Sequence, residues 1–241
     1  MSSFIRKSAL SAVAGAFMVG AVALMPAPVA ADEADDMVSI VNGGRLYDNW
    51  LKMTGAADPG KDHKSWKPAA GNKQTGDTTW RCKSCHGWDY KGKDGQQKGT
   101  EDETAAGGIT KSAGADPAKI IAVLKDATHD LGAVMKEDAM KDLANFVSKG
   151  QVDTAALLAK GGDAAKGKGY FETICVGCHK LDGSYPKDMA MKLGARVNIA
   201  PQRVLHNLIN GNPMGKMPSL RALDGQVALD ILAHLKTLPK S

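Results

Sequence analysis

The sequence repeats one five-residue pattern, Cys82-Lys83-Ser84-Cys85-His86 and Cys175-Val176-Gly177-Cys178-His179. The two segments contain all four cysteines of the 241-residue chain, and 89 residues separate Cys85 from Cys175. Closely spaced cysteines are typical of disulfide bonds, zinc sites, thiol redox centres and covalent haem attachment. Any interpretation also has to explain the histidine that follows each cysteine pair.

Three of these four chemistries remain as alternatives. An exported chain with four cysteines can form two disulfides. Two C-x-x-C pairs can hold one zinc ion, but the usual separation between such pairs is roughly 15–20 residues. A thioredoxin-like redox site needs no histidine directly after its second cysteine, and here a histidine follows both pairs.

Covalent haem attachment accounts for the whole pattern. The two thiols form thioethers with the two vinyl groups of one haem, and the adjacent histidine reaches the iron as its proximal ligand. We therefore predict two covalently bound haem c groups. The predicted residues are Cys82, Cys85 and His86 for the first haem and Cys175, Cys178 and His179 for the second. The aromatic content of only 5 % agrees, because each haem would itself fill much of a core.

The N-terminal residues 1–31 have the pattern of a secretory signal peptide. Arg6 and Lys7 precede an uncharged run of small apolar residues at 9–25, and two prolines and a small-residue segment follow. We expect cleavage before Asp32 and export to the periplasm; a retained membrane anchor is the alternative. No later segment approaches about 18 consecutive apolar residues, so we expect no membrane span in the mature chain.

Composition excludes several classes of protein. Hydrophobic residues make up 43 % and charged residues 24 %, which is typical of a globular protein rather than a disordered or polytopic membrane protein. Loss of the signal segment would reduce the formal charge from +5 to +3. No basic block carries interleaved aromatic residues, so we expect no nucleic-acid partner.

The segments around the two motifs also correspond to each other. Each half has a helix-like segment before its motif, a proline-started helix after it and a closing amphipathic helix, in which apolar residues recur at spacings of three and four. The matching ranges are 44–50 and 167–172, 117–124 and 201–208, and 137–148 and 225–238.

This order resembles the class I cytochrome c family, in which an N-terminal helix leads to C-x-x-C-H and a C-terminal helix packs across the first. The resemblance covers residues from about 37 to 239 and implies an all-α fold of two tandem cytochrome c domains. The expected organisation is a signal peptide at 1–31, domain 1 at 32–150 and domain 2 at 151–241. The first half departs from the family pattern through two polar insertions, 54–79 and 91–115, which we expect to form surface loops.

The distal ligand of the second iron is expected after the helix that starts at Pro201. The segment from Asn210 to Leu220 resembles the class I distal loop, in which a Met-Pro pair follows a glycine-rich turn. We predict Met217 as the ligand, with Met214 as the alternative. A thioether sulfur is a weak ligand that raises the reduction potential.

The corresponding loop of the first half contains no Met-Pro pair. His129 lies 14 residues before Leu143 of the closing helix, close to the 15 residues between Met217 and Leu232, whereas Met135 lies only 8 before Leu143. This spacing predicts His129 as the distal ligand of the first iron and leaves Met135 as the alternative.

A haem iron with two protein ligands has no open position for a substrate, which favours electron transfer over bond making. The expected function is a periplasmic electron carrier between redox protein partners, rather than an enzyme. Electrons would enter at the first haem and leave from the second, because methionine ligation raises the potential. The alternatives are a cytochrome subunit of a larger periplasmic oxidoreductase and a dihaem enzyme such as a peroxidase.

Overall fold

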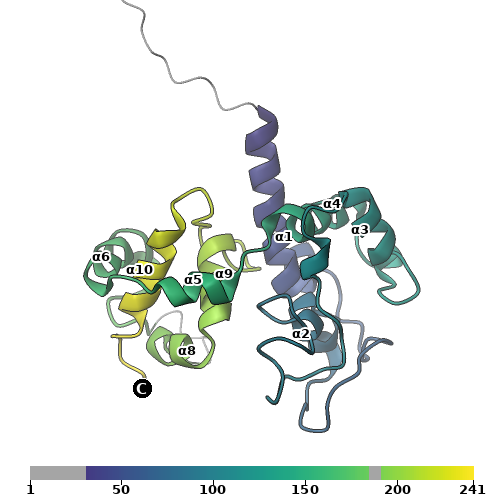
Figure 1. Ribbon diagram of the computed structural model, residues 1–241, viewed down its shortest axis with the longest axis horizontal. Coiled ribbons are helices and arrows are strands. Elements are labelled where there is room, and N and C mark those ends of the chain that lie inside the picture. The colour runs from purple at the N-terminus through teal and green to yellow at the C-terminus, as the bar shows by residue number, and fades with distance from the viewer. Residues whose placement is uncertain (1–30, 185–190) are drawn as a thin grey trace, which may run out of the picture.

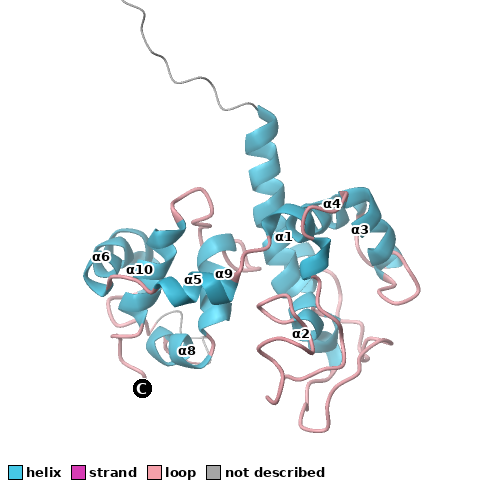
Figure 2. Ribbon diagram, viewed as in Figure 1, coloured by secondary structure: helices cyan, strands magenta, loops and turns pink. Residues whose placement is uncertain are grey.

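The computed structural model describes residues 31–184 and 191–241, which form helices joined by loops (Figures 1 and 2). The described part contains two isolated β-bridges but no β-strand. The expectation of an all-α fold class is therefore confirmed. The predicted signal segment lies outside the described residues, except for Ala31. Among the helices that are described, none is long and apolar enough to cross a bilayer.

Two hydrophobic cores divide the helices into two groups. The first core lies among α1 (Ala31–Thr54), α2 (Cys82–His86), α3 (Pro117–Leu124), α4 (Glu137–Asn145) and the π-helical turn Phe146–Gly150 that continues α4. The second lies among α5 (Thr154–Lys160), α6 (Ala164–Tyr170), the π-helical turn Phe171–Cys175, α7 (Val176–His179), α8 (Leu193–Ile199), α9 (Pro201–Asn210) and α10 (Gly225–Leu235). Figure 1 shows α1 between the two groups.

The long helix α1 bends at Asn49, where the backbone leaves helical geometry with φ −159° and ψ 90°. The Asn49 side-chain oxygen accepts the backbone N–H of Lys52 at 3.1 Å, as an N-cap residue does at the start of a new helix. On either side of the bend, the Tyr47 hydroxyl donates to the Gly87 carbonyl at 2.6 Å and the Trp50 indole donates to the Trp80 carbonyl at 2.8 Å. These bonds attach the end of α1 to the segment that carries the first motif.

A close helix crossing occurs in both groups, α1 on α4 and α6 on α10. A Cβ atom on Gly43 would lie 2.0 Å from the Asp142 carbonyl oxygen, and one on Gly167 would lie 1.8 Å from that of Asp230. Only glycine permits this approach of backbones in either place. The structure therefore aligns Gly43 with Gly167, one residue away from the Gly44 that the sequence repeat suggests.

The two groups meet where α1 approaches α9. The His206 ring is buried, with its Nε2–H donating to the Gly44 carbonyl at 2.9 Å and its Nδ1 facing the Tyr90 hydroxyl at 3.4 Å. Arg221 donates to the Gly150 carbonyl at 2.9 Å. The contact is therefore built from polar groups with matched partners as well as from apolar packing.

The two insertions of the first group are linked to each other. An isolated antiparallel bridge pairs Pro68 of the first insertion with Thr104 of the second, and another pairs Gly92 with Gly107 within the second insertion. A short 3₁₀ helix, Gly76–Trp80, ends the first insertion directly before the first motif. The second insertion lies beside α2, because the Thr104 hydroxyl donates to the Cys85 carbonyl at 3.2 Å and the Gly107 carbonyl lies 2.7 Å from the His86 Nδ1.

Candidate functional site

The first C-x-x-C-H motif borders a cavity of about 440 Å³, a size typical of small-molecule and cofactor sites. Cys82, Cys85 and His86 line it together with His129. Its remaining wall is mainly apolar and includes Ile109, Ile120, Leu124, Leu131, Leu143 and Val147. This lining would fit a large, mainly apolar ligand that cysteine and histidine side chains can bind at its reactive positions.

His86 and His129 lie opposite each other in this cavity, which His63 also lines. Their ring centroids lie 6.3 Å apart and their planes differ by 27°. A metal–imidazole bond is about 2 Å long, so one metal ion bonded to both rings would fit in this interval. The structure thus brings together His86 and the predicted distal residue, His129.

Hydrogen bonds hold both rings by their Nδ1 atoms. The His86 Nδ1 lies 2.7 Å from the Gly107 carbonyl oxygen, and because that oxygen can only accept, Nδ1 carries the proton and Nε2 remains available as a ligand. The His129 Nδ1 lies 3.3 Å from a carboxylate oxygen of Asp126. Such partners orient metal-binding histidines and set their tautomer.

The alternative residue Met135 lies elsewhere. Its side chain is only 4 % exposed and belongs to the first hydrophobic core, and it does not line the cavity. The structure therefore favours His129 over Met135 as the residue opposite His86.

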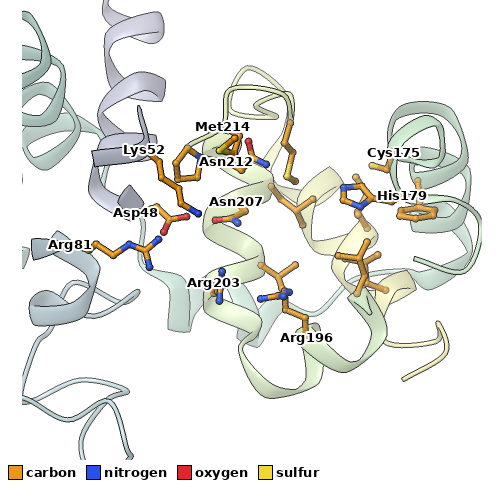
Figure 3. Close-up of a pocket in the computed structure, with 18 residues that line it drawn as sticks. Asp48, Lys52, Arg81, Cys175, His179, Arg196, Arg203, Asn207, Asn212 and Met214 are labelled. Atoms are coloured by element: carbon orange, nitrogen blue, oxygen red, sulfur yellow. The ribbon is translucent and has the colours of Figure 1, made fainter. Parts of the chain in front are cut away.

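The second motif borders a separate cavity of about 410 Å³. Cys175, His179 and both candidate methionines, Met214 and Met217, line it (Figure 3). Met217 packs against the second core, whereas Met214 is 60 % exposed. Cys178 is exposed and does not line the cavity.

Three of the four thiols, those of Cys82, Cys85 and Cys175, have raised pKa values, which does not suit a thioredoxin-like centre. Burial raises the pKa of Cys82 to about 12 and the pKa values of Cys85 and Cys175 to about 11. A redox-active thiol of a C-x-x-C motif has a lowered pKa, because the thiolate is the nucleophile. All four cysteines are free thiols in this structure, and no pair forms a disulfide.

Several residues of the second cavity come from the first group of helices. Asp48, Lys52 and Arg81 reach it across the contact between the groups, opposite Cys175 and His179 (Figure 3). Sequence reasoning assigned no role to these residues, or to the Gly107 carbonyl beside His86. Only the position of Arg81, directly before Cys82, was a local signal.

Buried polar atoms without partners test whether haem fits the second cavity. Within the described residues, the Nε atoms of Arg81 and Arg203 and the side-chain oxygens of Asn207 and Asn212 are buried and have no hydrogen-bond partner. All four residues line this cavity. Buried polar groups are nearly always paired, so the two arginine Nε–H donors indicate a ligand with acceptor groups such as carboxylates, whereas the two asparagine oxygens are acceptors and need a donor. A haem, which is apolar over most of its surface and carries two carboxylates, fits the apolar part of the lining and the two arginine donors.

Comparisons with protein-family models, curated proteins and solved structures give no match to this chain.

Proposed function

We propose that this chain is an exported dihaem c-type cytochrome of two tandem cytochrome c domains, which carries electrons between redox protein partners. One observation carries the proposal: each C-x-x-C-H motif borders its own cavity, and each cavity contains a second residue able to bind iron from another segment. Cys82, Cys85 and His86 would hold the first haem, and Cys175, Cys178 and His179 the second.

The chemistry that bound haem supplies is one-electron exchange at iron. The chain's own residues hold that group and surround it. Gly107 and Asp126 orient the imidazoles of His86 and His129, and Met217 is placed at the second cavity by its loop. The apolar side chains of both cavities exclude water, which limits the change in solvation when the charge of the site changes.

The two cavities differ in the residue that would be the second iron ligand, His129 in the first and Met217 in the second. This difference supports a direction of electron transfer between the haems. A bis-histidine iron has a lower potential than an iron with histidine and methionine ligands. Electrons would therefore enter at the first haem and leave from the second. The hydrogen-bonded contact between the two groups of helices, including His206 with Gly44, holds the two cavities in one relative position.

The test is to produce the full chain in a host that attaches haem to exported proteins. We expect a pyridine haemochrome assay to count two haems per chain and the intact mass to equal residues 32–241 plus two haems. Electron paramagnetic resonance of the oxidised protein should show two low-spin species, one with the signature of two histidines and one with that of histidine and methionine. A count other than two would overturn the proposal.

Paired cysteine variants assign each signal to its cavity. Replacing both cysteines of the first motif by alanine should leave one haem with the methionine signature. Replacing both cysteines of the second motif should leave one haem with the bis-histidine signature. Carbon monoxide binding by the reduced native protein would contradict two fully ligated irons and would favour an enzyme over a carrier.

A further inference from the structure

Arg81 lies on the walls of both cavities. It directly precedes Cys82, which places its backbone at the first motif, and its side chain extends toward α9 and the second cavity (Figure 3). Among the described residues, Arg81 and the cavity-lining residues Asp48 and Lys52 are contributed to the second cavity by the first group of helices. Arg81 is thus placed between two sites whose motifs are far apart in sequence.

The neighbourhood of Arg81 holds an excess of positive charge. Lys52, Arg81, Arg196 and Arg203 line the second cavity, with Asp48 as the carboxylate among its lining residues. Burial, and next the nearby Arg81, lower the pKa of Lys83 to about 8. Burial, and next the nearby Arg203, lower the pKa of Arg196. Four cations and one carboxylate on the wall of a single cavity favour the binding of an anion there.

The unpartnered atoms show where that anion would bind. The Nε of Arg81 and the Nε of Arg203 are both buried and lack a hydrogen-bond partner within the part of the chain that is described. A guanidinium presents several N–H donors in a planar fork that suits carboxylates. The two side chains come from different groups of helices and line the same cavity, so one carboxylate-bearing ligand would be held by both halves of the chain.

We propose that Arg81, together with Arg203, binds the carboxylate edge of the haem in the second cavity, and that Arg81 thereby sets the reduction potentials of both haems. This inference rests on the proposed function, because the anion is a substituent of the second haem. A fixed positive charge beside a redox site favours its reduced form, since reduction adds a negative charge. Arg81 acts on both sites because it lines both cavities, whereas Arg203 lines only the second.

The test is a redox titration of the holoprotein in which the two haems are followed by their separate ligand signatures. We expect Arg81→Gln to lower both midpoint potentials by about 59 mV. For one electron, this shift corresponds to a tenfold change in the ratio of oxidised to reduced haem. Arg203→Gln should lower only the potential of the second haem. Arg81→Lys, which keeps the charge, should retain most of the native values.

Two controls separate charge at the cavities from other effects. Lys98→Gln removes an exposed cation of the second insertion and should leave both potentials unchanged. Arg221→Gln removes a cation that bonds across the contact between the groups but lines neither cavity. It should lower the temperature of unfolding with a smaller change in potentials than Arg81→Gln.

The outcomes distinguish this inference from the proposed function. A shift in only one potential in Arg81→Gln, or shifts no larger than those of Lys98→Gln, would overturn the role of Arg81. If the Arg81→Gln variant does not fold or bind haem, Arg203→Gln provides the test. An unchanged potential of the second haem in Arg203→Gln would also overturn the inference. A native chain that carries fewer than two haems would instead overturn the proposed function.

Discussion

The guanidinium of Arg45 in the first half donates a hydrogen bond to the backbone carbonyl of Met217 in the second half, across 172 positions of sequence. The Nη2–oxygen distance is 3.3 Å, and the Nε of the same side chain donates to the Asn210 carbonyl at 2.9 Å. These two carbonyls lie at the beginning and near the end of the loop that carries the candidate methionine ligand. The loop is thus held by a residue of α1, which belongs to the first group of helices.

Replacement of Arg45 by glutamine should weaken the attachment of this loop. Hydrogen bonds from charged donors contribute about 1.5–3 kcal/mol. We expect the methionine-to-iron charge-transfer band of the oxidised protein to disappear at a temperature several degrees lower than in the native protein, with two haems still bound. The exposed neighbour Lys216 is the control, and Lys216→Gln should leave the temperature unchanged. Equal band stability in Arg45→Gln would contradict the role of the bond.

The two methionines of the second cavity should respond differently to substitution. Met217 is partly buried against the second core, whereas Met214 is largely exposed. We expect Met217→Ala to abolish the charge-transfer band and to lower the potential of the second haem, because a thioether ligand raises it. Met214→Ala should preserve both. Loss of the band in Met214→Ala alone would exchange the two assignments.

His129 and Met135 provide the same contrast in the first half. His129 faces His86 across the cavity, and Met135 is buried in the core. His129→Ala should convert the bis-histidine signal in the electron paramagnetic resonance spectrum into a high-spin signal. Met135→Ala should retain the low-spin signal but reduce the free energy of unfolding by roughly 2–5 kcal/mol, as large-to-small core substitutions do. A retained bis-histidine signal in His129→Ala would exclude it as the ligand.

Gly167 and Gly169 allow a comparison within one helix. A Cβ at Gly167 would lie 1.8 Å from the Asp230 carbonyl oxygen, while a Cβ at Gly169 would have no atom within 4 Å. We expect Gly167→Ala to reduce the free energy of unfolding by about 1–3 kcal/mol or more through overpacking. Gly169→Ala should increase it by roughly 0.5–1 kcal/mol, because alanine has the higher helix propensity. Chemical denaturation of the two variants gives the comparison, and equal stability would contradict the close crossing of α6 on α10.

His206 should make the contact between the two halves sensitive to acid. Burial lowers its pKa from 6.5 to about 4 in the folded protein. The unfolded chain binds the proton more readily, so this histidine's contribution to stability is complete above pH 6.5 and is lost as the pH falls toward 4. The loss amounts to roughly 2 kcal/mol by pH 5, since one pKa unit is about 1.4 kcal/mol.

The variant His206→Gln isolates this effect from the titration of carboxylates. It should be less stable than the native protein at pH 7.5, because the bond to the Gly44 carbonyl and the ring packing are altered. The difference between the two proteins should shrink at pH 5, because glutamine does not titrate. Urea unfolding at both pH values measures it, and a pH-independent difference would show that His206 has the same pKa in the folded and the unfolded protein.

The helices and cavities could be predicted to different extents from the sequence. The closing helix of the first half was expected at 137–148 and occurs as α4, Glu137–Asn145, continued by a π-helical turn; the second was expected at 225–238 and ends at Leu235. Local periodicity predicts such elements well because their apolar spacing follows directly from helix geometry. The motifs likewise locate the cavities: all three motif residues line the first cavity, whereas in the second motif Cys175 and His179 line the cavity and Cys178 lies outside it.

The residues contributed from the other half could not be predicted. Arg45 and His206 bond to residues more than 100 positions away, Arg81 lines the cavity of the second motif, and no local pattern marks which segment such a side chain will reach. The Gly107 carbonyl reaches His86 only because an isolated bridge between Gly92 and Gly107 folds the polar insertion back. Its sequence carries no hydrophobic periodicity, which is why a surface loop was expected there.

Helix α1 packs on α4 and also on α9, so a single helix borders both cores. A fragment starting after residue 150 would expose the α9 surface around His206 to water and would lack Asp48, Lys52 and Arg81 from its cavity wall. The two groups of helices are therefore not interchangeable modules. If recombination exchanged one half alone, the incoming half would also have to fit this shared helix. We therefore expect the two halves to be inherited together.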